Sequence, residues 1–294
     1  MSRIREKFRE LKRSGRGGFI PFITIGDPDL ATTECLLIEL AKAGADVIEL
    51  GVPFSDPVAD GEVIQRASER ALRNGVTLQD ALTCASNVRK RIDVPFVLFS
   101  YFNPLLQFGQ ERLAVAARQA GIDGVLVTDL IPEEADSWTQ NLLRHRLDPI
   151  FLAAPTTSDK RLARSAQHAR GFIYAVSRAG VTGERDQITR DAEALVKRVR
   201  FVSDLPVAVG FGISSPEQVR AVWRFADAAV VGSAIVRQIE KLRDSPDLVK
   251  HIGEFARWLH RTGWVADFPR NTLLSGAHSV FKRRITSFDV SSHL

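Results

Sequence analysis

The stretch PVAVGFGISSPEQVRAVWRFADAAVVGS, residues 206–233, contains two short apolar runs separated by a segment with helical spacing. The runs at 206–212 and 227–233 are short, rich in valine and alanine, and bounded by glycine or proline, which is typical of buried strands. The segment between them opens with Ser-Pro, a pair that favours the start of a helix. A strand, a helix and a second strand in this order predict a βαβ unit with parallel strands.

The same alternation recurs along the chain. Segments with helical spacing, such as TECLLIELAKAG and QERLAVAARQAG, separate the apolar runs. Eight strand–helix units predict an α/β protein, a single (β/α)8 TIM barrel. An open doubly wound sheet is the alternative, which is weakened because no GxGxxG follows the first strand. The six further predicted strands are 18–26, 46–51, 95–101, 123–129, 149–154 and 171–177.

The N-terminus adds one element to the barrel pattern. The segment RIREKFRELKR predicts an amphipathic leading helix with Ile4, Phe8 and Leu11 on one face. An RNA-binding arm is the alternative for this basic stretch. The net charge is +5 over 294 residues, but acidic residues lie among the basic ones and no basic stretch is rich in aromatic residues. We therefore expect no nucleic-acid partner.

Composition also limits the location and the chemistry. No run approaches the roughly 20 apolar residues needed to span a membrane, and the charged N-terminus lacks the apolar core of a signal peptide, so a cytoplasmic location is expected. Cys35 and Cys84 lack the spacing of a metal site, and both are predicted to be free thiols that pack in the protein interior. All six histidines fall in helical segments or the tail, so we expect no metal and expect carboxylates to carry any acid–base chemistry.

The segment ELGVPFSDPVADG, residues 49–61, places an acid near the end of a predicted strand and two more in the loop that follows. In a barrel of this type, reactive groups gather at the C-terminal ends of the strands. If Ile48 and Leu50 point outward, Glu49 points into the barrel mouth, where desolvation should raise its pKa and suit it to proton transfer. A structural acid bonded to backbone amides or to a nearby cation is the alternative.

Two tyrosines and three glycine-rich loops converge on the same face. Tyr101 closes the third predicted strand and Tyr174 lies within the sixth, where each hydroxyl could orient a substrate or simply pack in the core. Glycine-rich segments follow strands six, seven and eight at 177–184, 210–214 and 232–235. Each alone is weak evidence because glycine also serves ordinary turns. Three in succession favour a phosphorylated small-molecule substrate.

These motifs, with PFITIGDPD at 21–29, resemble the tryptophan synthase α-subunit family over residues 1–263. The resemblance implies a lyase that splits indole-3-glycerol phosphate into indole and D-glyceraldehyde 3-phosphate by retro-aldol cleavage, in tryptophan biosynthesis. It implies no cofactor for this chain. It also implies a partner β subunit that holds pyridoxal phosphate, in an α2β2 heterotetramer.

The resemblance assigns roles to particular residues. Glu49 is implied to be the general acid and base, and Asp60 to accept a hydrogen bond from the indole N–H and stabilise the charge that develops there. Pro53 and Asp56 are implied to contact the β subunit. The implied substrate-binding residues are Phe22, Phe99, Tyr101, Thr128, Tyr174, Thr182, Gly183, Phe211, Gly212, Gly232 and Ser233.

The sequence departs from the family pattern in three places. Glu62 and Ile131 stand where proline is usual, and the change at 62 could loosen the loop that carries Asp60. Residues 264–294 lie beyond the family's usual end and are predicted to form a disordered C-terminal extension. Two alternatives remain for the function: a stand-alone indole-producing lyase and a catalytically silent regulatory partner. The intact pair of Glu49 and Asp60 argues against the second.

Overall fold

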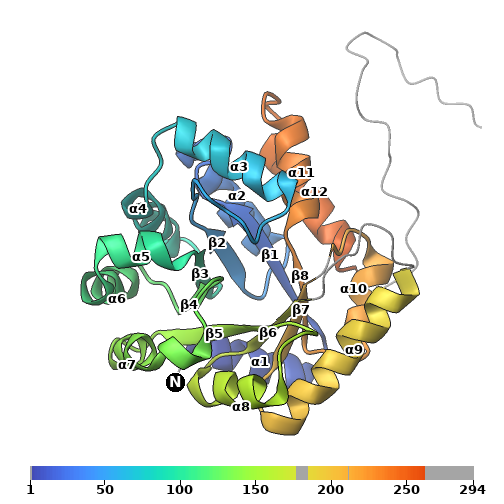
Figure 1. Cartoon of the computed structure of the whole chain (residues 1–294). Coiled ribbons are helices and arrows are strands. Elements are labelled where there is room, and N and C mark those ends of the chain that lie inside the picture. The colour runs from blue at the N-terminus through green and yellow to red at the C-terminus, as the bar shows by residue number, and fades with distance from the viewer. Residues whose placement is uncertain (1, 177–184, 211, 262–294) are drawn as a thin grey trace, which may run out of the picture. The chain divides into compact units, whose positions relative to one another are not determined.

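Eight parallel strands close into a barrel in the computed structural model, which describes residues 2–176, 185–210 and 212–261 (Figure 1). Each strand pairs with the next along the chain, and the last pairs with the first. The predicted (β/α)8 barrel and its eight strands are therefore confirmed. The strands are β1 (Gly18–Thr24), β2 (Ile48–Gly51), β3 (Phe96–Ser100), β4 (Gly124–Val127), β5 (Asp148–Ala153), β6 (Ile173–Val176), β7 (Val207–Gly210) and β8 (Ala228–Val231).

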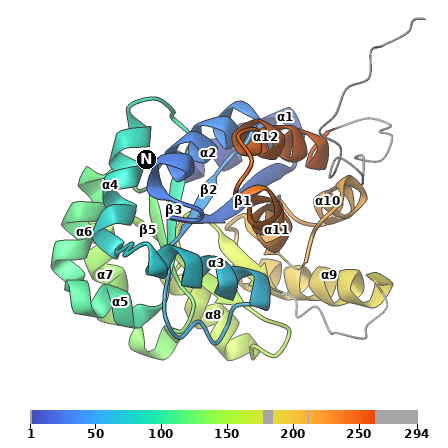
Figure 2. The same ribbon diagram turned by 90° about the horizontal axis from the view of Figure 1, so that it is seen from above.

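Helices surround the barrel, as the two views in Figures 1 and 2 show. Their starts follow capping chemistry. The helix predicted from residue 33 begins at Leu30, because the Asp29 carboxylate accepts a hydrogen bond from the Thr32 amide. The helices are α1 (Arg3–Ser14), α2 (Leu30–Lys42), α3 (Glu62–Arg73), α4 (Leu78–Arg89), α5 (Phe102–Phe108), α6 (Gln110–Gln119), α7 (Asp136–Arg144), α8 (Asp159–His168), α9 (Arg185–Val202), α10 (Pro216–Trp223), α11 (Ser233–Leu242) and α12 (Leu248–Leu259), with the 3-10 turn η1 (Pro132–Glu134).

Helix α1 closes the N-terminal end of the barrel. Ile4, Phe8 and Leu11 are buried and belong to one core cluster with side chains from the strands. The ring centroids of Phe8 and Phe172 lie 5.6 Å apart inside this cluster. The predicted amphipathic leading helix is therefore confirmed, and its apolar face packs against the barrel interior.

Three carboxylates, of which Asp46 and Asp123 are buried, secure the same end of the barrel. Asp46, Asp123 and Asp227 each accept a backbone N–H from the start of a neighbouring strand, at 2.8 to 2.9 Å. Each also pairs with arginine, and Arg16 contacts both oxygens of Asp46 at 3.0 and 2.7 Å. Charge-assisted bonds of this kind hold a geometry firmly. These acids stabilise the end of the barrel opposite the mouth, as is expected for the N-terminal face of this fold.

The two cysteines differ in environment. Cys84 is buried in α4, as predicted, whereas Cys35 is exposed on α2, so the prediction that Cys35 is a packing residue is wrong. The physical reason is helical phase. The buried side of α2 carries Thr33, Leu36 and Leu40, and position 35 falls on the other side.

Within the part of the chain that the structure describes, no helix has the length and apolar character needed to cross a membrane. The predicted C-terminal extension, residues 264–294, lies outside the described residues.

Candidate active site

Glu49 lies fully buried on β2, beside Phe22 of β1 and Val97 of β3. Neither of its carboxyl oxygens hydrogen-bonds to any residue in the described ranges. Burial raises the pKa of Glu49 well above its usual range, because no partner among the described residues offsets the loss of solvation. The alternative of a structural acid held by amides or by a cation finds no such partner in this part of the chain. The site therefore favours a neutral, proton-bearing carboxyl group.

Three aromatic rings from separate strands form a wall at the barrel mouth. Phe22 of β1 and Phe99 of β3 meet edge to face with ring centroids 5.3 Å apart, and Phe99 and Tyr174 of β6 lie at 6.5 Å. Burial raises the pKa of Tyr174, and the carboxyl groups of Glu49 and Asp60 add to that rise. Tyr174 therefore lies close enough to both predicted catalytic acids for their charges to act on its hydroxyl. The apolar rings and few polar groups of the mouth suit a flat aromatic ligand.

Room for these rings depends on two strand glycines, Gly51 and Gly210, whose role was not predicted from the sequence. A Cβ atom at Gly51 would overlap the ring of Phe22, and one at Gly210 would overlap the hydroxyl of Tyr174. Glycine inside a strand often marks a close approach of this kind, and that signal could have identified both residues.

Asp60 lies at the end of the loop between β2 and α3 and is partly buried. Burial raises the pKa of Asp60 to about 6, and a hydrogen bond with Tyr101 offsets part of that rise. The Tyr101 hydroxyl also accepts the Ala59 amide at 2.9 Å, and Gln65 donates to the Asp60 carbonyl at 2.8 Å. Tyr101, predicted to bind substrate, thus also holds the loop that carries Asp60.

The same loop presents an exposed tip. Asp56 is exposed and accepts a hydrogen bond from the Ser55 hydroxyl, and Val58 is 88% exposed. Pro53 is buried instead, so its ring is not available to a partner in this conformation. Of the two predicted contact residues, only Asp56 lies on the surface.

The predicted phosphate residues lie at the ends of β7 and β8. Gly232 immediately precedes α11, whose first residue is Ser233, and no side chain in the described residues caps this helix start. Uncapped amides at a helix N-terminus attract anions. Gly212 is exposed and has a φ of 49°, a left-handed conformation that glycine adopts readily. The predicted residues Thr182, Gly183 and Phe211 lie outside the described residues.

Thr128 follows β4 at the same end of the barrel and is half-buried. Its hydroxyl donates to the Ser100 carbonyl at 3.2 Å, which joins the ends of β3 and β4. It therefore lies among the strand ends that carry the other predicted site residues.

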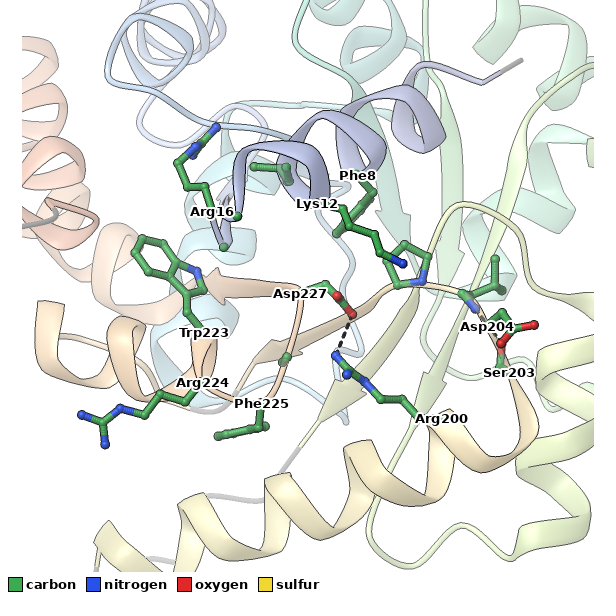
Figure 3. Close-up of a pocket in the computed structure, with 16 residues that line it drawn as sticks. Phe8, Lys12, Arg16, Arg200, Ser203, Asp204, Trp223, Arg224, Phe225 and Asp227 are labelled. Atoms are coloured by element: carbon green, nitrogen blue, oxygen red, sulfur yellow. Dashed lines mark hydrogen bonds and ion pairs between the residues drawn. The ribbon is translucent and has the colours of Figure 1, made fainter.

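A groove of about 550 Å³ opens at the opposite end of the barrel (Figure 3). Lys12, Arg200, Trp223 and Asp227 are among its lining side chains, and Arg200 pairs with Asp227 at 3.2 Å. None of the predicted site residues lines this groove. Because reactive groups in this fold gather at the C-terminal ends of the strands, we place the active site at the mouth and not in the groove.

The mouth therefore holds two carboxyl groups in different environments. Glu49 is buried without a described partner, whereas Asp60 is partly buried and hydrogen-bonded by Tyr101. Two carboxyl groups in such different environments can have different roles: one can donate and accept protons, and the other can stabilise a positive charge. Among the described residues, no group of three or more His, Cys, Asp or Glu side chains is arranged to hold a metal ion.

Comparisons with known proteins point to one family. Residues 8–260 match the family model for the tryptophan synthase alpha chain. A protein of that name from Solibacter usitatus is 48% identical over 261 residues, which cover 89% of this chain and 98% of the relative. One from Geobacter sulfurreducens is 51% identical over 241 residues, covering 82% and 91%. The crystal structure of tryptophan synthase subunit alpha from Legionella pneumophila has a TM-score of 0.83 at 38% identity, covering 88% of this chain and 97% of that one.

Proposed function

Because the chain belongs to the tryptophan synthase alpha chain family, we propose that its barrel mouth, with Glu49 and Asp60, carries out the family's reaction. The chain is a lyase that cleaves indole-3-glycerol phosphate to indole and D-glyceraldehyde 3-phosphate, the alpha reaction of L-tryptophan biosynthesis. The observation that supports the placement best is the fully buried carboxyl group of Glu49, which has no hydrogen-bond partner among the described residues and lies near Tyr174.

Glu49 serves as both acid and base in this proposal. Cleavage requires a proton on carbon 3 of the indole ring and loss of the proton from the side-chain hydroxyl. Neutral Glu49 gives its proton to carbon 3, and the resulting carboxylate takes the hydroxyl proton as the carbon–carbon bond breaks. The carbonyl of the aldehyde forms, the electron pair returns to the indole ring, and Glu49 ends in its starting state. Each such proton transfer is worth about 10² to 10⁴ in rate.

Asp60 balances the charge at the other side of the ring. Protonation of carbon 3 leaves positive charge on the indole nitrogen, and the ionised carboxylate accepts a hydrogen bond from the N–H. The pKa of about 6 leaves Asp60 mostly ionised at neutral pH, as this role requires. The apolar walls around it strengthen the attraction.

The direct test is indole release from indole-3-glycerol phosphate by the purified chain, alone and with a cognate β subunit. Turnover that rises with the β subunit supports the proposal. Full turnover by the chain alone would instead favour a stand-alone lyase. No turnover under either condition would favour a silent regulatory partner.

Gly232→Asp is expected to weaken phosphate binding. The new carboxylate would stand beside the phosphate at the start of α11, so the affinity for glycerol 3-phosphate should fall more than tenfold, or about 1.4 kcal/mol. The Cβ atom itself is tolerated, because it would lie 3.6 Å from Phe22, an ordinary contact distance.

Isothermal titration calorimetry measures this effect, with Gly232→Ala as the matched variant that adds the Cβ without the charge. The Ala variant should lose less affinity than the Asp variant. Equal affinity of Gly232→Asp and the wild type would move the phosphate site to another part of the mouth.

A β subunit is the proposed partner, in an α2β2 heterotetramer. Exposed Asp56 and Val58 on one loop give it a charged and an apolar contact, and the loop ends at Asp60. A partner that docks on this loop can therefore change the position of Asp60 directly. We propose that Asp56 contacts the partner and that buried Pro53 supports the loop from within.

Asp56→Ala should blunt activation by the β subunit and leave the basal rate of the isolated chain nearly unchanged. The measurement is the pair of indole-release rates with and without the partner. Asp93→Ala is the control, because Asp93 is also a highly exposed acid, with a side chain 93% exposed, but precedes β3 at the other end of the barrel. If Asp56→Ala lowers both rates equally, Asp56 serves the chemistry and not the contact.

All the proton transfers above are assigned to side chains of this chain, so the lyase step is proposed to need no cofactor here. Pyridoxal phosphate is assigned to the β subunit. We propose a cytoplasmic location, which fits a biosynthetic enzyme family.

A further inference from the structure

Four charged side chains form a continuous chain of ion pairs beside the barrel mouth. Asp27 lies in the turn after β1, Arg66 and Arg70 lie on α3, and Glu240 lies in α11. Arg70 donates to both Asp27 oxygens at 2.7 and 2.9 Å and to Glu240 at 2.8 Å. Arg66 donates to both Glu240 oxygens at 2.7 and 2.9 Å. Three elements far apart in the sequence are thus joined through one network.

Burial makes this network more than a surface salt bridge. The side chains of Asp27, Arg70 and Glu240 are 1%, 15% and 21% exposed. Burial raises the pKa of Asp27 and Arg70 offsets only part of that rise, whereas hydrogen bonds, first from Arg66, lower the pKa of Glu240 to about 2. Glu240 is therefore ionised throughout the working range of pH. Bidentate hydrogen bonds between guanidinium and carboxylate groups fix the relative orientation of the two side chains as well as their distance.

The two helices joined by Glu240 each begin at a part of the proposed active site. Helix α3 follows Asp60 after a single residue, and α11 follows Gly232 directly. The helices lie side by side in both views (Figures 1 and 2). On their inner side, Ala67 of α3 and Val236 of α11 pack around Phe22. An apolar contact inside and an ionic contact outside therefore hold α3 and α11 as one unit.

We propose that Glu240 and Arg70 are positioning residues for the reaction, because they fix the separation between Asp60 and the N-terminus of α11. Indole-3-glycerol phosphate has its ring at one end and its phosphate at the other, so both ends must be engaged at once. If the distance between Asp60 and the N-terminus of α11 is fixed before the substrate binds, binding of the phosphate at α11 also places the indole N–H next to Asp60. The inference rests on the proposed roles of Asp60 and of Gly232 with Ser233.

Glu240→Gln tests the proposal, because the amide keeps the shape of the side chain but loses the charge that binds both arginines. We expect kcat/KM for indole-3-glycerol phosphate to fall about tenfold. Affinity for glycerol 3-phosphate, which occupies the phosphate end alone, should change less than about twofold. The fold should survive because the Asp27–Arg70 fork remains, and the melting temperature checks this.

Glu69→Gln is the matched control. It makes the same substitution on α3, but Glu69 pairs at 3.6 Å with Arg73 of the same helix, and these side chains are 63% and 77% exposed. Exposed pairs within one helix contribute little and join no second element. Its kcat/KM should match that of the wild type, and an equal loss in both variants would overturn the proposal.

A double-mutant cycle with Asp60→Asn separates the inference from the proposed function, with single-turnover rates measured at excess enzyme. If Glu240 acts through the position of Asp60, Glu240→Gln should cost much less in the Asp60→Asn background than in the wild type. Equal losses in both backgrounds, an unchanged rate in Glu240→Gln, or a parallel loss of glycerol 3-phosphate affinity would overturn the positioning role. An unchanged rate in Asp60→Asn alone would overturn the role of Asp60 instead.

Discussion

Glu49→Gln will abolish indole release while the substrate still binds. The amide keeps the shape of the buried carboxyl group but cannot give a proton to carbon 3 or take one from the hydroxyl. The expected loss in turnover is about 10² to 10⁴ or more, since one group performs both transfers. Steady-state indole release measures the loss, and calorimetric titration with a non-cleavable substrate analogue measures the binding. Turnover above about a tenth of the wild-type rate would show that Glu49 is not the acid and base.

The stability of the same variant gives an independent check. Burial raises the pKa of Glu49 above its ordinary value of 4.5, so the unfolded chain releases this proton at a lower pH than the folded protein does. In the wild type, this group therefore lowers the free energy of unfolding as pH rises from about 4.5 towards its folded pKa. Glutamine does not titrate, so the Glu49→Gln variant does not lose this stability as pH rises. Its melting temperature should therefore equal or exceed that of the wild type, and the difference should grow as pH rises from about 4.5 towards the folded pKa of Glu49. A variant that is both inactive and unstable would point to a structural role.

The fold was predictable because one physical pattern repeats along the chain. Buried strands alternate with helices that carry one apolar face, and eight such units are the number that closes a parallel barrel, as they do here. The strand ends were less predictable. The seventh strand was predicted to end at 212 and ends at Gly210, and the fourth was predicted to end at 129 and ends at Val127. In both strands the backbone ladder stops two residues before the predicted end, because the chain turns out of the sheet at the mouth, which the residue pattern alone does not mark.

The candidate site was predictable where local geometry determines it. Alternation along β2 placed Glu49 in the mouth, and the structure buries it there. The network of Asp27, Arg70 and Glu240 was not predictable, since its members lie 43 and 170 residues apart and meet only when α3 packs on α11. The burial of Pro53 likewise depends on how its loop folds back, which motif matching does not reveal.

Asp60→Asn should lower indole release about 10²-fold or more, the second-largest loss that we expect. An amide oxygen can still accept a hydrogen bond from the indole N–H, but it cannot balance the positive charge that carbon 3 protonation creates. Stabilisation of developing charge in a desolvated site is often worth this much. The measurement is kcat/KM for indole-3-glycerol phosphate, and unchanged turnover would remove Asp60 from the mechanism.

The pH dependence of the wild-type enzyme tests the same assignment without loss of activity. Because the pKa of Asp60 is raised to about 6 and only the ionised form balances charge, kcat/KM should fall as pH drops through about 6. Tyr101 lowers that pKa by hydrogen bonding, so Tyr101→Phe should move the acidic limb of the profile to higher pH. The limb should vanish in Asp60→Asn, whose residual activity should be flat across this range. If the limb persists there at the same pH, it belongs to another group, and the positive charge on the indole must be balanced elsewhere in the mouth.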